Sequence, residues 1–241
     1  MTWLLLLGII VLAQSIETVT GFGCTVLALA LGVHLVPVEE WVVTLVLIAL
    51  LQSAWLVVRG FREIRWGLLL KRIVPCCVAG MPLGFWSFNV LSSDHLKLVL
   101  GGFVIVVSVV ELRRLYRHGH SAKPLSPAPG CALLAGGGFF HGLFASGGPL
   151  VVYFASREIP EKGRFRATLS TLWLTLNTVL LISYAFTGRP LAGAATRAAA
   201  LAPALVAGIV VGEVLHARVD ERAFRWIVQG LLFLTGLFLL V

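Results

Sequence analysis

Residues 17–24, ETVTGFGC, place a glutamate and two glycines inside an apolar run that extends from about Trp3 to Val36. Glycine is a poor helix former, so a helix that crosses a membrane is expected to break at this motif. Residues 144–149, FASGGP, interrupt the apolar run from about Gly130 to Ala155 in the same way, and the proline reinforces the break. The two motifs therefore predict two apolar segments that are broken or re-entrant.

The composition indicates that lipid is the solvent for most of the chain. Of 241 residues, 59% are hydrophobic and 12% are charged, and the mean hydropathy is +0.96. Soluble domains average about 25% charged residues. Apolar runs of about twenty residues, enough for a helix to cross roughly 30 Å of hydrocarbon, recur along the whole chain. Because only helices pair all their backbone groups within one such run, we expect an all-α, polytopic protein of the inner membrane.

The basic residues do not indicate nucleic-acid binding. The formal net charge is +8, but the Lys and Arg residues stand in short blocks between apolar runs, as expected of loops near anionic lipid. The four cysteines lie within apolar runs and lack the spacing of a zinc site or a disulfide framework, which predicts small buried side chains. No metal or other cofactor is expected.

The chain reads as two copies of one four-segment unit. The pattern P-x3-A-G-x3-G occurs at residues 75–84 and again at 203–212, where we expect its small residues to allow close helix packing. The longest polar connection divides the chain into a first repeat (1–115), a cytoplasmic linker (116–129) and a second repeat (130–241). The eight apolar segments are about 3–36, 41–58, 73–90, 96–112, 130–155, 167–186, 194–215 and 224–241.

The distribution of basic residues favours inverted repeats. If every segment crossed the membrane once, Lys and Arg would be divided almost evenly between the two faces, against the usual excess in cytoplasmic loops. If the fifth segment enters and leaves on one side, residues 157–166 become cytoplasmic. All of the 19 Lys and Arg residues except Lys97, Arg189 and Arg197 then lie on the cytoplasmic face. We therefore expect the first and fifth segments to be re-entrant or deeply broken, and the halves to be inverted.

The two glycine motifs also predict an anion site. Non-helical backbone at membrane depth has to line a cavity or be covered by protein, and half-helices that begin there aim free N–H groups at it. Amides at corresponding positions of the two halves could donate to ligand oxygens. The predicted substrate-binding residues are Thr20, Gly21, Phe22, Gly23, Gln52, Ser146, Gly147, Gly148 and Asn177.

Glu17 and His141 precede the two breaks by similar distances and are the predicted proton-coupling residues. An ionisable side chain at that depth is costly enough to suggest a function, and histidine can relay a proton. Structural readings stay open for all these positions: glycines packed tightly between helices, amides bonded between helices, a paired or interfacial glutamate, and a neutral core histidine.

These motifs carry a resemblance to a known family. GFG at 21–23 followed by LAL at 27–29, the series Gly138-x3-Gly142-x4-Gly147-Gly148-Pro149, and the two P-x3-A-G-x3-G helices resemble the TauE/SafE sulfite-exporter-like permeases over the whole chain. The chain departs from the family pattern at Ala30, where a proline is frequent, and at ASGGP, which replaces a GxGGG run.

The resemblance implies a secondary transporter for sulfite, sulfoacetate or a related organosulfonate or small organic anion. Alternating access is the expected mechanism, with protons as a candidate coupling ion. The expected partners are the small anionic substrate and membrane lipids, and assembly as a homodimer is left open.

Two other function classes are weighed against transport. Ala145-Ser146-Gly147 echoes the serine loop of rhomboid intramembrane proteases, with His216 as a conceivable base. However, Phe144 stands where that motif requires glycine, and a serine–histidine pair must make a hydrogen bond. A purely structural membrane protein would have no use for a glutamate within the membrane or for paired helix breaks. We therefore do not expect an enzyme.

Overall fold

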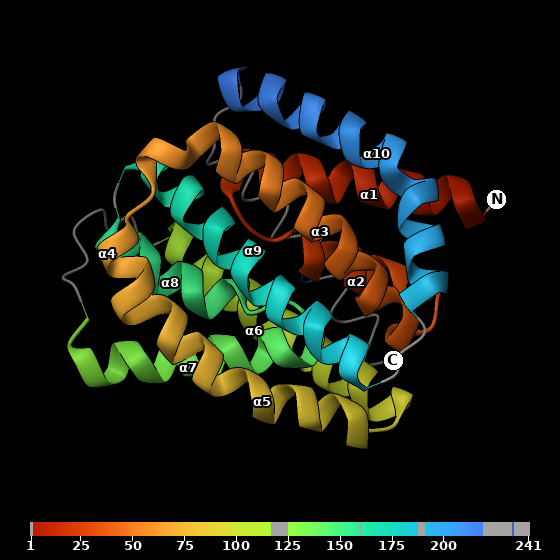
Figure 1. Cartoon of the computed structure of the whole chain (residues 1–241), viewed down its shortest axis with the longest axis horizontal. Coiled ribbons are helices and arrows are strands. Elements are labelled where there is room, and N and C mark those ends of the chain that lie inside the picture. Colours follow the sequence, from red (N-terminus) through yellow and green to blue (C-terminus); the bar gives the residue numbers. More distant parts are fainter. Residues whose placement is uncertain (1, 117–124, 160, 188–190, 219–232, 234–241) are drawn as a thin grey trace.

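A computed structural model describes residues 2–116, 125–159, 161–187, 191–218 and 233 (Figure 1). Every regular element in this part of the chain is a helix. The predicted last segment, about 224–241, and most of the predicted linker at 116–129 lie outside the described residues. The elements are α1 (Thr2–Thr20), α2 (Cys24–Gly32), α3 (Val38–Gly60), η1 (Phe61–Glu63), α4 (Trp66–Leu68), the π-helix η2 (Leu69–Ile73), α5 (Val74–Val90), α6 (Ser93–Tyr116), α7 (Pro127–Phe144), α8 (Gly148–Glu158), α9 (Lys162–Phe186) and α10 (Leu191–Arg218).

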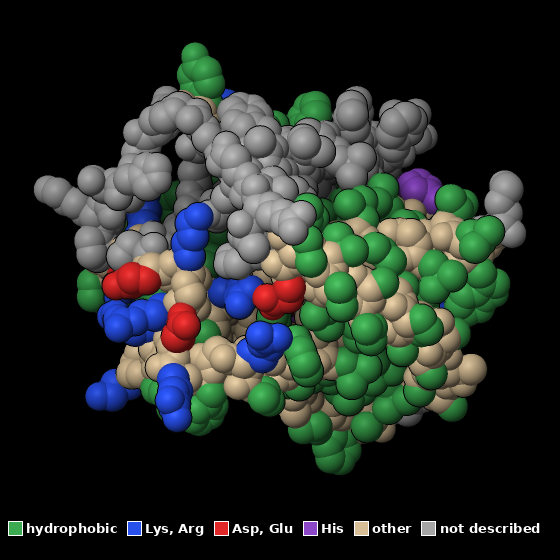
Figure 2. Space-filling model, turned by 90° about the horizontal axis from the view of Figure 1, so that it is seen from above, with side chains coloured by type: hydrophobic (Ala, Val, Ile, Leu, Met, Phe, Trp, Pro, Cys, Tyr) green, Lys and Arg blue, Asp and Glu red, His purple; other side chains and the backbone are tan. Residues whose placement is uncertain are grey.

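Five stretches of described helix are long and apolar enough to cross a membrane: Thr2–Thr20, Val38–Glu63, Trp66–Val90, Lys162–Phe186 and Leu191–Leu215. Their outward faces carry large apolar side chains such as Leu83, Trp86 and Val210, which are more than half exposed. Figure 2 shows a broad apolar surface of this kind, with Lys, Arg, Asp and Glu gathered toward one end. The prediction of an all-α, polytopic membrane protein is confirmed.

The two P-x3-A-G-x3-G helices pack against the first helix of the opposite half. On α5, a Cβ at Gly80 or Gly84 would overlap the backbone of Ala135 or Phe139 of α7. On α10, a Cβ at Gly208 would meet Gln14 of α1 at 2.7 Å. The prediction that these glycines permit close helix packing is confirmed. The two halves are therefore interlocked through α5–α7 and α1–α10, with α3 packed against α9 between them.

The cysteine prediction is wrong for two of the four residues. Cys76 of α5 and Cys131 of α7 form a disulfide across a Cα–Cα distance of 5.5 Å, whereas Cys24 and Cys77 are free and buried. The pair is 55 residues apart in sequence and belongs to two different halves. No sequence spacing reveals it, because the sulfur atoms meet only through the tight α5–α7 contact.

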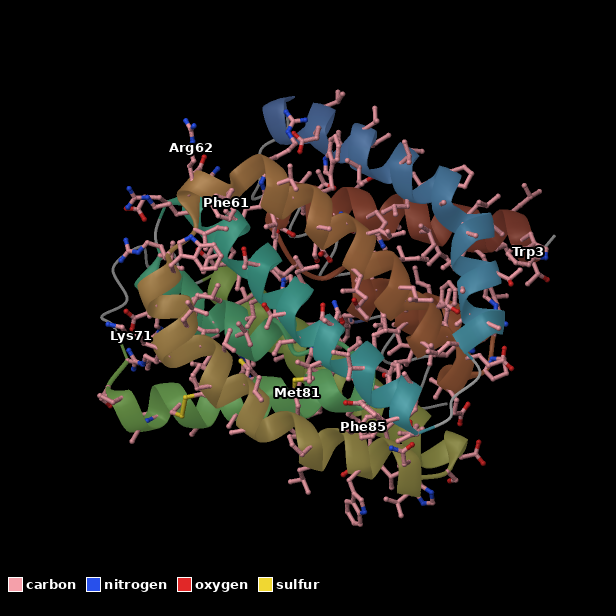
Figure 3. The ribbon with its side chains drawn as sticks, in the orientation of Figure 1. Trp3, Phe61, Arg62, Lys71, Met81 and Phe85 are labelled. Carbon is pink, nitrogen blue, oxygen red and sulfur yellow. A yellow bond between two sulfur atoms is a disulfide. The ribbon has the colours of Figure 1, made fainter. Side chains whose placement is uncertain are left out.

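The segment formed by α7 and α8 begins and ends at the same end of the bundle. Arg72 donates to the Leu125 carbonyl oxygen just before α7 (3.1 Å) and forms an ion pair with Glu158 at the end of α8 (3.2 Å). The backbone N–H of Arg65 also donates to Thr168 Oγ1 near the start of α9 (3.0 Å). Residues 157–159 and 161–166 therefore lie at the same end as the basic stretch that contains Arg62 and Lys71, labelled in Figure 3.

The segment formed by α1 and α2 begins and ends at the opposite end. Helices α1 and α10 run in the same direction, because Gly208 packs on Gln14 and Gly212 packs on Thr18. At the start of α10, Arg197 forms an ion pair with Glu40 at the start of α3, the helix that follows α2. Trp3, at the start of α1, lies on the far side of the molecule from Lys71 in Figure 3. The two broken segments thus enter the bundle from opposite ends.

Candidate functional site

The first break separates α1 from α2 at residues 21–23. Gly21 and Gly23 have φ angles of 81° and 100°, in the left-handed region that residues with a Cβ avoid. A Cβ at Gly21 would also lie 3.1 Å from the Cα of Arg166. The hydroxyl of Thr20 lies 2.8 Å from the carbonyl oxygen of Ile16 within α1 and 2.8 Å from that of Phe22 in the break, and it can donate its proton to either. Both glycines are therefore needed for the backbone to turn here.

The second break separates α7 from α8 at residues 145–147. Ala145 has a φ of 52° and ends α7 with a hydrogen bond from its N–H to the His141 carbonyl oxygen (2.7 Å). A Cβ at Gly147 would overlap the carbonyl of Gly137, so only glycine fits there. Pro149 follows at the first turn of α8, where its missing N–H costs nothing.

The two breaks meet at one cavity of about 20 Å³. Such a space holds one or two water-sized groups, so a larger ligand requires the lining to move apart. The lining comes from α1, the two breaks, the first turns of α2 and α8, and helices α3, α7 and α9. It comprises Glu17, Gly23, Thr25, Val26, Ala49, His141, Ala145, Ser146, Gly147, Gly148, Trp173 and Asn177.

The beginnings of α2 and α8 both contribute to this lining. The first N–H groups of a helix have no partner within it, and the helix dipole makes this end partly positive. Thr25 and Val26 lie in the first turn of α2, and Gly148 is the first residue of α8. Both helix beginnings therefore place positive dipole ends at one cavity, which suits a negatively charged ligand.

Three buried side chains of the lining carry polar atoms that have no hydrogen-bond partner among the described residues. They are the two ring nitrogens of His141, Oγ of Ser146 and Oδ1 of Asn177, in residues that are 1%, 4% and 2% exposed. Leaving a buried polar atom without a partner costs about 1–3 kcal/mol of folding free energy. Such atoms are therefore rare unless a ligand, ion or water pairs with them. These side chains therefore point to a ligand in the cavity.

Trp173 connects the two breaks. Its Nε1 donates to the carbonyl oxygen of Gly21 (2.9 Å), while its ring stacks on His141 with centroids 5.8 Å apart and planes 13° apart. It lies one helical turn before Asn177 on α9, so both residues face the cavity. Trp173 was not among the residues predicted from the sequence, because a tryptophan in an apolar helix resembles any other core or lipid-facing side chain.

Glu17 is the acidic residue of the lining. It is 3% exposed, and its carboxyl group faces the backbone N–H and thiol of Cys24 at the start of α2. No Lys or Arg is among the lining residues that the structure describes. The nearest basic contact to the first break is made by Arg166, which donates to the carbonyl oxygen of Thr18 (3.1 Å) and pairs with Glu213 of α10 (3.5 Å).

The predicted site residues divide into two groups. Gly23, Ser146, Gly147, Gly148 and Asn177 line the cavity together with Glu17 and His141. Thr20, Gly21, Phe22 and Gln52 do not line it.

The second group lies beside the cavity. Thr20, Gly21 and Phe22 form the end of α1 and the first break itself, and Phe22 packs near Gly148. The Gln52 amide of α3 donates to the Gln14 carbonyl oxygen and to Thr18 Oγ1 (3.0 Å each), so it holds α3 against α1.

Comparisons with known proteins agree with this architecture. A family model described as sulfite exporter TauE/SafE matches residues 6–239. The probable inner membrane transporter protein TsaS of Comamonas testosteroni is 27% identical over 183 residues, which cover 74% of this chain and 73% of that protein. The probable sulfite/organosulfonate exporter TauE of Cupriavidus necator is 24% identical over 235 residues, which cover 91% of this chain and 86% of that protein. No solved structure matches the chain. Because the family model covers nearly all of its residues, the chain belongs to the sulfite exporter TauE/SafE family.

Proposed function

We propose that this transporter moves a small sulfur-containing or organic oxyanion, such as sulfite, sulfoacetate or a related organosulfonate, across the inner membrane by alternating access. Membership of the family makes the protein a membrane transporter and not an enzyme. The choice of substrate class is supported by the name of the Cupriavidus necator relative, a probable sulfite/organosulfonate exporter. The printed name of the Comamonas testosteroni relative describes that protein as an inner membrane transporter. The five helices able to cross a membrane agree with a multi-pass inner-membrane protein.

One observation carries the proposal: two helix beginnings and three unpartnered polar side chains share one buried cavity. Oxyanions accept several hydrogen bonds at once, and the Ser146 hydroxyl and the NH2 group of the Asn177 side chain can donate to them. Gly23, Gly147 and Gly148 let the anion approach the backbone. In this role Thr20, Gly21 and Phe22 hold the shape of the first break, and Gln52 holds α1 in position.

The positions at which the two broken segments begin and end support inverted repeats. The α7–α8 segment starts and finishes at Arg72, and the α1–α2 segment starts and finishes at the end that carries Arg197. Two such segments that approach one cavity from opposite faces suit alternating access, in which one half moves relative to the other. Because the cavity holds only one or two water-sized groups, the proposed cycle includes a conformation in which its lining moves apart to admit the anion.

Glu17 and His141 are the proton-coupling residues of the proposed mechanism. They are the two lining residues whose side chains can gain or lose a proton, and they come from the two predicted repeats, on α1 and α7. The protease alternative has no support, because Ser146 Oγ makes no hydrogen bond to a histidine among the described residues. A purely structural role is excluded by membership of a transporter family.

The direct test is the thermal stability of the purified protein against a panel of sulfite, sulfoacetate, taurine, sulfate, acetate and chloride. A ligand that binds only the folded protein stabilises it by about 2.7 kcal/mol at a hundredfold excess over Kd. We expect sulfite or a sulfonate to raise the Tm more than chloride at equal ionic strength. If no anion of the panel raises the Tm, the proposed function is wrong.

A matched pair of variants links the stabilisation to the cavity. Asn177→Leu removes an amide of the lining at nearly constant size and should abolish the anion-dependent rise in Tm. Thr178→Val changes the neighbouring residue, which is exposed and bonded to the Leu174 carbonyl oxygen within α9 (2.7 Å). The rise in Tm should persist in this control. A rise that survives equally in both variants would place the anion elsewhere.

A further inference from the structure

The cavity contains two groups that can change charge and, among its described lining residues, no permanent cation. Glu17 contributes a carboxyl group from α1, and His141 contributes an imidazole from α7 whose nitrogens have no partner among the described residues. The remaining positive potential comes from the beginnings of α2 and α8, which supply partial charges only. The net charge of the side chains is therefore −1, 0 or +1, depending on the protons that the two groups hold.

An anion and an ionised Glu17 cannot share this space without a large penalty. The cavity measures about 20 Å³, so an anion inside it lies within a few ångströms of the carboxyl group. Two like charges about 4 Å apart, at an effective dielectric constant of about 20, repel by enough to weaken binding roughly a thousandfold. One proton removes most of this penalty, either by neutralising Glu17 or by charging His141 to offset it.

We propose that the anion and at least one proton occupy this cavity together, so that the protein cotransports protons with its anion rather than exchanging one for the other. The inference rests on the proposed anion site and adds the sign of the coupling. Exchange would require the proton to leave as the anion arrives. Two acid–base groups line the same small cavity as the anion, and this favours uptake of a proton when the anion binds.

The charged and titratable groups around Glu17 support this assignment. From α2 the carboxyl group is faced by Cys24, and from α7 by His141 across the cavity. From α9 the lining residues Trp173 and Asn177 are uncharged.

Arg166 and Glu213 approach the other side of α1. They pair with each other, and Arg166 binds the Thr18 carbonyl oxygen, so neither is among the lining residues. From α3, Gln52 is uncharged and is bonded to Thr18. No neighbouring cation among these groups is placed to neutralise Glu17 permanently.

Stacking on Trp173 would stabilise a positive charge on the His141 imidazole, so His141 is the second group that could hold the proton. The Trp173 indole ring lies nearly parallel to the imidazole with a centroid distance of 5.8 Å, within the range at which a cation is stabilised by an aromatic face. A protonated His141 would also carry an N–H that can donate a hydrogen bond to an oxyanion. The proton can therefore act in one of two ways. It either neutralises Glu17 or gives His141 a positive charge.

The test measures proton uptake when methanesulfonate, whose own charge is constant near neutral pH, binds the purified protein in weakly buffered detergent solution. We expect uptake of about one proton per bound anion, and a Kd that rises up to about tenfold per pH unit as pH increases. Proton release, or binding with no proton uptake and no pH dependence, would overturn the coupling while leaving the anion site intact. Absence of binding at every pH would instead overturn the proposed function and the inference with it.

Variants identify the proton carrier. If Glu17 carries the proton, Glu17→Gln should still bind methanesulfonate, but its Kd should no longer change with pH. If His141 carries it, His141→Gln should lose most of the affinity for methanesulfonate as well as the proton uptake, because no positive charge then offsets the ionised Glu17. The control is Glu40→Gln, which changes a carboxylate that pairs with Arg197 at the end of the bundle, outside the cavity. It should retain the proton uptake of the parent protein, and loss of uptake in this control would overturn the assignment to the cavity.

In proteoliposomes, an inside-alkaline pH gradient should drive methanesulfonate accumulation, and collapsing the gradient should stop it. Accumulation driven instead by an inside-acid gradient would show exchange and overturn cotransport.

Discussion

Replacing Trp173 by phenylalanine tests whether the two breaks act as one site. The change keeps an aromatic ring next to His141 but removes the N–H that donates to the Gly21 carbonyl oxygen at 2.9 Å. A buried carbonyl left without its donor costs about 1–3 kcal/mol of folding stability. Because this bond fixes the first break relative to α9, we also expect anion affinity to fall by at least about tenfold, equivalent to about 1.4 kcal/mol.

Trp41→Phe is the matched control. The Trp41 Nε1 donates to the Ala28 carbonyl oxygen of α2 at 2.8 Å, and the side chain is fully buried but is not among the cavity lining residues. Both variants lose the same donor, so both should lower the Tm in a circular dichroism melt. Only Trp173→Phe should weaken the anion-dependent rise in Tm. The reasoning fails if Trp173→Phe binds anions like the parent, or if both variants lose affinity in proportion to their stability.

Four further outcomes follow from the packing. Gly84→Leu should prevent stable assembly of the bundle, because a Cβ there would overlap the Phe139 carbonyl. The control is Gly102→Leu, where a Cβ meets open space, and its Tm should remain close to that of the parent. Reduction of the Cys76–Cys131 disulfide should lower stability by about 2–4 kcal/mol, and Cys76→Ser should show the lower Tm without reductant. A cysteine at Arg164 should react with a membrane-impermeant maleimide from the cytoplasmic side and one at His34 from the opposite side; reaction of both from one side would contradict inverted halves. Arg197→Gln should cost about 1 kcal/mol in a melt, because Glu40, its partner in the ion pair, is 52% exposed and solvent screens the pair.

The sequence predicted the helical membrane fold and the positions of both helix breaks, because each depends on local composition. Gly21 and Gly147 mark places where a side chain would be strained or would overlap backbone, and that requirement is visible as glycine in the sequence. The Cys76–Cys131 disulfide was missed because it depends on which helices meet, and helix pairing leaves only weak marks in a single chain.

Gln52 and Asn177 show the same limit at the site. They occupy similar positions in the two halves, but the structure places Asn177 in the cavity lining and bonds Gln52 to the backbone and side chain of α1. A repeat in sequence therefore indicates related positions without fixing the same environment. Trp173 was overlooked for the opposite reason: a tryptophan in an apolar helix looks like any other lipid-facing or core side chain until its N–H is seen bonded to Gly21.

The absence of Lys and Arg from the described cavity lining has a physical reason in a transporter. A permanent cation buried beside the anion would form a strong ion pair in a low-dielectric site, and breaking that pair would slow release on the far side of the membrane. Helix dipoles provide weaker, permanent attraction, and in the proposed mechanism a proton on Glu17 or His141 lowers the electrostatic penalty only while it is bound. If that proton leaves on the opposite face, the same cavity holds the anion firmly at one stage and releases it at the next, which is the property that transport requires.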